Sequence, residues 1–484
     1  MSIKKATVSN VKWSFIESIS LQVVSFILSL VLARLLEPSA FGVLAIVNVF
    51  YLLTTLFIDS GLKEALIQKA EVTEVDYSSV FWLNMGKSVF IYSCLFIVAP
   101  YIQDSYGYEN LSFYIRLQSL TLIIEAFGLV QIVKAIKDLQ IKKITKARIP
   151  ASLISLLVGI TMAYHGFGIV SLIVQQLVNV FIYSLLLVVN IRFRPSFVFD
   201  FKLVLPLYKF GVRLLGVSLI SRFYAQSLNL IYAKAYSPTT LGLYSKSTSM
   251  QNTPIDIING PFLKGLYPTL VKLQNNTKPL KKIVLQNIKT VTFLILIVNG
   301  IFYFQAHEII RLLLGVKWFG MEPYVKIAAV GSTFFPINGQ CQSIFKVKNK
   351  VNLFFKIELI SKIVVLVTIF SLISFYDLPQ ILWLIVIITI LTSVTYFYFT
   401  SRILSFSFKK ELYSLLFLML IHALAGFGLN FCIKLLFAHI PALFSIMIFG
   451  FIYFVLTAFL FYVFNKKIIG NLFKNNKFLK IKIS

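Results

Sequence analysis

The sequence predicts an all-α polytopic membrane protein with about fourteen transmembrane helices, arranged as two pseudo-symmetric six-helix bundles plus two C-terminal helices. Three observations predict this class. The residues are 58% hydrophobic and 13% charged with a mean hydropathy of +0.85, whereas soluble proteins carry about 25% charged residues. Runs of about 20 apolar residues recur, each long enough to cross roughly 30 Å of hydrocarbon. The plan of these runs also repeats within the chain.

The apolar runs define the expected spans in chain order. The first run, roughly Trp13 to Leu32, is too long for the core of a signal peptide and lacks a cleavage site, so we expect a helix there. The expected spans have their centres near residues 22, 50, 91, 122, 156, 179, 220, 253, 295, 335, 364, 389, 422 and 452.

The basic residues predict the orientation of these spans. Most of the 46 Lys and Arg residues fall in alternate connecting segments, beginning with the N-terminal one. Because cytoplasmic segments are enriched in Lys and Arg, both termini are expected in the cytoplasm. The net charge of +28 then reflects topology and contact with anionic lipid, and it gives no reason to expect nucleic acid as a partner.

Two stretches of the chain share one pattern. Residues 33–42 and 233–242 both read Ala, a base, three variable residues, Pro, a hydroxyl residue, one variable residue, an apolar residue and Gly. A second echo relates Leu129–Gly166 to Gly339–Tyr376. A chain that repeats its own helix plan is built from two related bundles, and such pairs usually form transporters.

The repeat predicts how the chain is divided, with the two bundles related by a pseudo-twofold axis. The expected regions are 1–195 for the N-terminal six-helix bundle, 196–408 for the C-terminal six-helix bundle, 409–465 for two extra transmembrane helices, and 466–484 for a basic cytoplasmic tail.

Small polar residues follow one face of the first span. Ser18, Gln22, Ser25 and Ser29 are spaced four, three and four apart, and the seventh span answers with Ser218, Arg222, Ala225 and Asn229 in the same register. Close helix packing would explain the small residues but leaves Arg222 unexplained, because an idle charge in lipid is costly. The pattern favours a water-filled cavity lined by these two spans.

Other spans also carry polar and charged residues. The eighth span is polar around Lys246, and Pro254 and Pro261 predict a bend or an interruption. Lys87 in the third span and Glu125 in the fourth have two readings, a structural ion pair or a functional site. Glu358 and Lys362 lie four residues apart, which predicts a local helix pair.

The chemistry of an enzyme or metalloprotein is not indicated. No Gly-rich phosphate-binding loop of the Gly-x-x-x-x-Gly-Lys-Ser/Thr type occurs, and the four His and three Cys residues lack metal-ligand spacing. No nucleophile with a neighbouring base is evident. We therefore expect no catalytic residues, no metal and no cofactor.

Several motifs together resemble one transporter family. These are Leu32–Leu36 followed by Pro38 and Phe41-Gly42, the stretch Asp59–Gln68, and Leu241–Ser245. In this order, with duplicated halves, they resemble the Wzx-type oligosaccharide flippases, in the branch of colanic-acid and teichuronic-acid exporters, often labelled lipopolysaccharide biosynthesis proteins. That family is part of the multidrug/oligosaccharidyl-lipid/polysaccharide exporter superfamily.

The resemblance implies a function and a location. A flippase of this kind moves an oligosaccharide linked to undecaprenyl diphosphate from the cytoplasmic to the outer leaflet of the bacterial inner membrane by alternating access, for cell-surface polysaccharide biosynthesis. The implied partners are lipid-linked oligosaccharide, membrane lipid and other polysaccharide-assembly proteins.

The resemblance also suggests roles for the polar residues. The expected cavity and substrate-binding residues are Arg222, Lys87, Lys246, Gln22, Ser25 and Asn229, with Arg222 meeting the diphosphate. The residues that could couple transport to an ion are Glu17, Glu125 and Asp59. In a structural alternative, Arg222 instead forms a buried pair with Glu17 or Glu125.

Two other functions stay open. The acidic residues would also suit a cation-coupled multidrug exporter of the same superfamily. A membrane polysaccharide polymerase or ligase is the second alternative, but those families generally use a large outer loop, and the longest here runs only from about Ala306 to Glu322.

Overall fold

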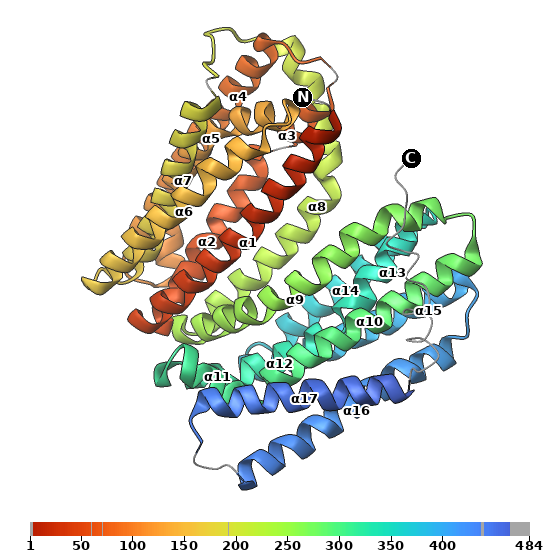
Figure 1. Cartoon of the computed structure of the whole chain (residues 1–484). Helices are drawn as coiled ribbons and strands as arrows, with labels where there is room; N and C mark the ends of the chain where they lie inside the picture. Colours follow the sequence, from red (N-terminus) through yellow and green to blue (C-terminus); the bar gives the residue numbers. More distant parts are fainter. Residues whose placement is uncertain (1–2, 60, 70, 192, 437–439, 465–484) are drawn as a thin grey trace. The chain divides into compact units, whose positions relative to one another are not determined.

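The computed structural model describes residues 3–59, 61–69, 71–191, 193–436 and 440–464. Over these residues the chain is helical, with no strand (Figure 1). The fold class predicted from the sequence is confirmed. The expected basic tail, 466–484, lies outside the described residues.

The chain forms two compact units, residues 1–242 and 243–484. The boundary falls in α9 (Pro238–Lys272), which starts in the first unit and continues in the second. The predicted boundaries at 195 and 408 come from the internal repeat, whereas these units are defined by contacts within the structure. The repeat-based boundaries therefore stay predictions. The two units are therefore described separately.

Unit 1 consists of antiparallel and crossing helices joined by short connections. Its helices are α1 (Ile3–Leu35), α2 (Pro38–Asp59), α3 (Leu62–Gln68), α4 (Glu74–Tyr106), α5 (Leu111–Lys137), α6 (Ile141–Tyr164), α7 (Ile169–Ile191) and α8 (Phe201–Ala235). α6 packs against α1 and α7, and α5 packs against α4 and α7. α8 packs against α2, α3 and α4, so the helix of the predicted seventh span is part of this unit.

Tight local structure shapes the turn between α2 and α4. Gly61 adopts a left-handed conformation with φ of 70°, and a Cβ built there would lie 2.5 Å from the backbone of Gly211 in α8. Thr73 and Asp76 form a capping box that begins α4, and Lys69 Nζ lies 2.6 Å from Asp76 Oδ1. These contacts anchor the short helix α3 between the longer ones.

The two copies of the repeated motif meet each other. A Cβ built on Gly42 would lie 1.8 Å from the carbonyl oxygen of Pro238, and a Cβ on Gly242 would lie 1.8 Å from that of Pro38. The start of α2 and the start of α9 therefore pack backbone against backbone in a reciprocal way. Only glycine permits this approach, which gives the Gly of the repeated pattern a physical reason.

Unit 2 continues with shorter helices in its middle. Its elements after α9 are α10 (Thr277–Phe304), α11 (Ala306–Leu313), the 3₁₀ helix η1 (Val316–Met321), α12 (Glu322–Ser332), α13 (Phe335–Val347), α14 (Val351–Leu372), α15 (Leu378–Leu404), α16 (Phe408–Leu436) and α17 (Ala442–Phe464). α9 is one continuous helix with Pro254, Pro261 and Pro268 inside it. The sequence predicted either a bend or an interruption of this helix at its prolines, and the helix is not interrupted.

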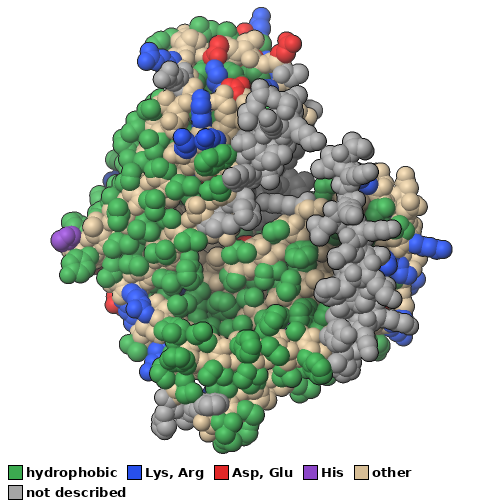
Figure 2. Space-filling view, in the orientation of Figure 1, with side chains coloured by type: hydrophobic (Ala, Val, Ile, Leu, Met, Phe, Trp, Pro, Cys, Tyr) green, Lys and Arg blue, Asp and Glu red, His purple; other side chains and the backbone are tan. Residues whose placement is uncertain are grey.

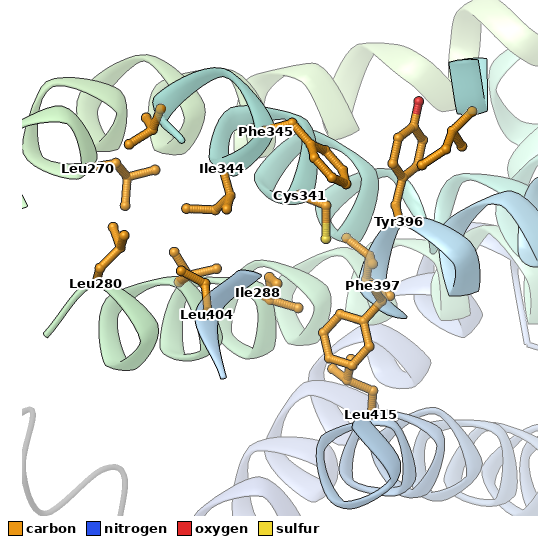
Figure 3. Close-up of a cluster of buried hydrophobic side chains, with 14 residues drawn as sticks. Leu270, Leu280, Ile288, Cys341, Ile344, Phe345, Tyr396, Phe397, Leu404 and Leu415 are labelled. Carbon is orange, nitrogen blue, oxygen red and sulfur yellow. The ribbon is translucent and has the colours of Figure 1, made fainter. Parts of the chain in front are cut away.

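A buried apolar cluster holds several helices of unit 2 together. Leu270, Ile288, Cys341, Tyr396 and Leu415 come from five different helices and belong to this cluster (Figure 3). The Tyr396 hydroxyl donates to Glu358 Oε2 at 2.6 Å. Glu358 also pairs with Lys362 at 3.1 Å, which confirms the predicted local helix pair.

Ten described helices or helix segments are long and apolar enough to cross a membrane. The other four expected spans fall on α8, α9, the broken pair α12 and α13, and α14. The total of fourteen therefore stays a prediction. Hydrophobic side chains cover much of the visible surface in Figure 2, as expected where helices face lipid.

Candidate functional site

Unit 1 contains a polar cavity of about 400 Å³ among its helices. The wall combines charged, amide, hydroxyl and aromatic side chains with a few apolar ones. The polar and aromatic residues that line it are Thr55, Lys63, Asn84, Glu125, Arg148, Asn179, Tyr183 and Ser184. They come from α2, α3, α4, α5, α6 and α7, so most helices of the unit contribute.

The cavity lies toward one end of the unit. It is lined where α2 ends, where α3 and α6 begin, and along the C-terminal halves of α5 and α7. The described connections at this end include 71–73, 138–140 and 193–200, which the distribution of basic residues predicts to lie on the cytoplasmic side.

Arg148 is the central cation of the wall. Its Nη1 lies 3.4 Å from Glu17 Oε1 on α1, and its guanidinium lies 5.2 Å from the centre of the Tyr183 ring. Glu17 also accepts a hydrogen bond of 3.0 Å from Thr145. The side chain of Glu17 is only 14% exposed, whereas that of Arg148 is 50% exposed and faces the cavity. The ion pair thus links α1 to α6 and leaves the guanidinium accessible.

Glu125 on α5 contributes a carboxyl group to the wall of the cavity. The Tyr51 hydroxyl on α2 donates a hydrogen bond of 2.6 Å to Glu125 Oε1. Lys63 on α3 lines the same space.

Two amides complete the polar wall. Asn84 is 1% exposed, and its Oδ1 has no hydrogen-bond partner among the described residues. Asn179 Nδ2 donates to Ser155 Oγ at 3.0 Å. A buried amide oxygen without a partner is costly, so it calls for an explanation.

The structure brings two of the predicted ion-coupling residues to this cavity. Glu125 lines it directly, and Glu17 contacts it through Arg148. The third, Asp59, has a side chain outside the described residues, as does Arg222.

The remaining predicted residues lie elsewhere. Lys87 Nζ bonds the carbonyl oxygen of Ile58 at 2.5 Å and lies 5.7 Å from the centre of the Tyr208 ring. Gln22 and Ser25 are exposed on α1, and Gln22 donates to Ser18 at 3.3 Å, as their shared face predicts. Asn229 donates to Gln226 at 3.4 Å on α8. Lys246 is 6% exposed on α9 and is part of unit 2.

Arg148, Lys63 and Asn179 are not among the site residues predicted from the sequence. Arg148 and Lys63 lie in basic segments that the predicted topology already explains. A usable signal was present, since Thr145, Arg148, Ser152 and Ser155 share one helical face of α6, and Gln175 and Asn179 share one of α7.

Unit 2 has cavities of a different kind. One of about 340 Å³ is lined mostly by apolar and aromatic residues, with Asn299, Thr333 and His422 as its main polar ones. Another, of about 480 Å³, is lined by His307, Glu308, Glu322, Lys326 and Lys434 among others.

The fold is similar to that of solved multi-pass membrane proteins. A solved structure titled lipid II flippase MurJ, in an inward closed conformation, has a TM-score of 0.72 at 12% identity, covering 93% of this chain and 99% of that one. An inward-facing multidrug resistance transporter of the MATE family has a TM-score of 0.61 at 13% identity, covering 80% and 96%.

Sequence comparison identifies the family. The chain belongs to the family described as "Polysaccharide biosynthesis protein", which matches residues 31–323. It is 25% identical over 369 residues to the lipopolysaccharide biosynthesis protein WzxC of Escherichia coli, covering 74% of this chain and 73% of that protein. It is 22% identical over 362 residues to the teichuronic acid biosynthesis protein TuaB of Bacillus subtilis, covering 73% and 74%. The resemblance stated from the motifs is confirmed.

Proposed function

We propose that this protein flips an oligosaccharide linked to undecaprenyl diphosphate from the cytoplasmic to the outer leaflet of the inner membrane by alternating access. Both termini would lie in the cytoplasm, and the cargo would feed cell-surface polysaccharide synthesis together with other assembly proteins. The observation that carries the proposal is the family match over residues 31–323, which begins near the end of α1, covers the rest of unit 1 and reaches α12 in unit 2.

The residue chemistry supports a hydrated, anionic cargo. A diphosphate cannot cross hydrocarbon unaided, and basic side chains within membrane helices lower that barrier. Lys246 is buried on a polar helix, and Lys87 lies within α4. The proposal assigns the diphosphate to Arg222, supported by these two lysines, with Gln22, Ser25 and Asn229 lining the path.

A cation-coupled multidrug exporter is the second candidate. The observation that favours it is the carboxylate of Glu125 in the cavity, hydrogen-bonded to Tyr51. A multidrug transporter also shares the fold. The two functions differ in cargo, so they are separated by a transport assay with defined substrates.

The test replaces Arg222 and measures transport of a fluorescent lipid-linked oligosaccharide in proteoliposomes. Guanidinium can hold phosphate by two parallel hydrogen bonds, whereas Lys acts as a point charge. Arg222→Lys should keep partial activity, and Arg222→Ala or Arg222→Glu should abolish it with the protein level unchanged. Arg402→Ala, at an exposed position beside Tyr398, is the matched control and should transport normally.

Three results would contradict the proposal. Loss of folded protein together with activity in Arg222→Ala would indicate a structural ion pair. Full transport by a well-expressed Arg222→Ala protein would exclude Arg222 from the cargo path. Transport of organic cations without transport of the lipid-linked oligosaccharide would favour the multidrug exporter.

A further inference from the structure

The cavity in unit 1 is balanced in charge. Among the described side chains, Lys63 and Arg148 are basic, while Glu125 lines the wall and Glu17 pairs with Arg148 at 3.4 Å. A diphosphate brought here would meet the carboxylate of Glu125 and compete with Glu17 for the guanidinium. The wall therefore favours a solute that is neutral and rich in hydrogen-bonding groups.

Asn84 gives a second, independent indication of a ligand. The residue is 1% exposed, yet its Oδ1 has no hydrogen-bond partner among the described residues. It lines the same cavity as Asn179, Thr55 and Ser184. An amide carries both donors and acceptors, which matches the hydroxyl groups of a sugar, each of which donates and accepts.

The size of the cavity agrees with such a ligand. Its volume of about 400 Å³ lies within the roughly 300–1,000 Å³ that small-molecule sites occupy. Tyr183 adds an aromatic body with a polar end to the wall. The distribution of basic residues predicts that the cavity lies at the cytoplasmic end of unit 1, where the sugar of a lipid in the cytoplasmic leaflet would be presented.

We propose that this cavity binds the glycosyl part of the lipid-linked oligosaccharide, with Asn84, Asn179 and Arg148 as hydrogen-bonding residues. The diphosphate is held outside it. This assignment rests on the proposed function, and it specifies which part of the cargo binds and in which cavity. It makes unit 1 the unit that distinguishes one sugar from another.

The test compares two lipids that differ only in the sugar. The full chain is purified in nanodiscs that contain either undecaprenyl diphosphate or undecaprenyl-diphosphate-linked oligosaccharide extracted from the producing strain. Binding is measured by native mass spectrometry for the wild type, Asn84→Ala, Asn179→Ala and the double variant. Asn352→Ala, an exposed asparagine on α14, is the matched control.

Each single variant should bind the oligosaccharide-linked lipid about three- to tenfold more weakly, and the double variant more weakly still. Binding of undecaprenyl diphosphate should not change in any of them. Asn84→Ala should keep the thermal stability of the wild type, since the residue it removes has an unpaired buried oxygen. A merely structural asparagine would lower stability instead.

Other outcomes overturn the assignment. Equal weakening for both lipids would make the cavity an anion site, and unchanged binding of both would exclude it from recognition. A third outcome would make the cavity an ion-coupling site. In that case Glu125→Gln would bind both lipids normally but not transport, and the asparagine variants would behave like the wild type. If the wild type binds neither lipid, the proposed function fails, and this assignment fails with it.

Discussion

The cavity of unit 1 and the apolar cavity of unit 2 are similar in size but opposite in character. The first, of about 400 Å³, carries Lys63, Glu125 and Arg148 in its wall. The second, of about 340 Å³, is lined mainly by aromatic and aliphatic groups, with His422 and Tyr453 bonded to each other at 3.2 Å. Charges placed among membrane helices are costly and point to function, whereas aromatic packing serves cohesion. The difference teaches that volume alone does not identify a site.

One asparagine in each polar centre differs in how completely its hydrogen bonds are satisfied. In unit 2, Asn299 accepts from Gln251 at 2.5 Å and donates to Ser332 and Thr333 at 3.1 and 2.9 Å. In unit 1, the oxygen of Asn84 has no partner among the described residues. A saturated amide holds helices together, and a buried amide oxygen without a partner calls for an explanation.

The largest expected effect concerns the charged pair of unit 1. Arg148→Ala should lower export of lipid-linked oligosaccharide more than about tenfold, because it removes a cavity cation and leaves Glu17 without its ion-pair partner. His422→Leu in unit 2 should export normally. Export is measured in cells together with membrane abundance. If both variants export equally well, the functional contrast between the cavities is broken.

Two glycines at tight contacts, Gly42 in unit 1 and Gly300 in unit 2, allow the stabilities of the two units to be compared. A Cβ on Gly42 would lie 1.8 Å from a backbone oxygen, whereas one on Gly300 would lie 2.3 Å from the side chain of Tyr453. Gly42→Ala should therefore cost about 3 kcal/mol or more, above the roughly 1–3 kcal/mol of ordinary overpacking expected for Gly300→Ala. Thermal unfolding of the purified proteins measures both. The reverse order would show that the backbone contact between α2 and α9 is easily opened.

A smaller loss is expected at the saturated amide of unit 2. Asn299→Ala should destabilise the protein by about 2 kcal/mol, because Gln251, Ser332 and Thr333 would lose a buried partner. Asn84→Ala in unit 1 is the matched variant and should have little effect on the melting temperature. Equal losses at the two positions would remove the distinction between a structural and a ligand-binding amide.

The smallest effect belongs to the polar cavity at the predicted outer end of unit 2. Burial raises the pKa of Glu322, but hydrogen bonds from Lys326 and His307 outweigh it and hold the pKa below its usual value. The carboxylate thus contributes stability above its usual pKa, and that contribution is lost as pH falls through the lowered pKa. Glu322→Gln should cost less than about 1 kcal/mol near neutral pH and flatten the acid limb of a stability profile. The prediction is contradicted if the stability of Glu322→Gln falls with decreasing pH as steeply as that of the wild type.

The sequence by itself determined the class of protein and the positions of its helices. Apolar runs and basic connections are local properties, so they predicted the helical fold, and ten of the expected spans coincide with helices able to cross a membrane. Local spacing also predicted the pair of Glu358 with Lys362, and the repeated motif marked the starts of α2 and α9. These features depend on a few neighbouring residues, and helix periodicity alone connects them.

Only the tertiary structure decided which polar residues share a site. Glu17 and Arg148 lie on α1 and α6, far apart in sequence, and their contact depends on how those helices pack. Arg148 was indistinguishable from the basic residues that set topology, because a charge two turns inside a helix looks the same in sequence as one at its end. The same holds for Asn84, whose unpaired oxygen is a property of its surroundings and not of its spacing. Contacts between helices are set by packing over the whole unit, which is why the cavity appeared only in three dimensions.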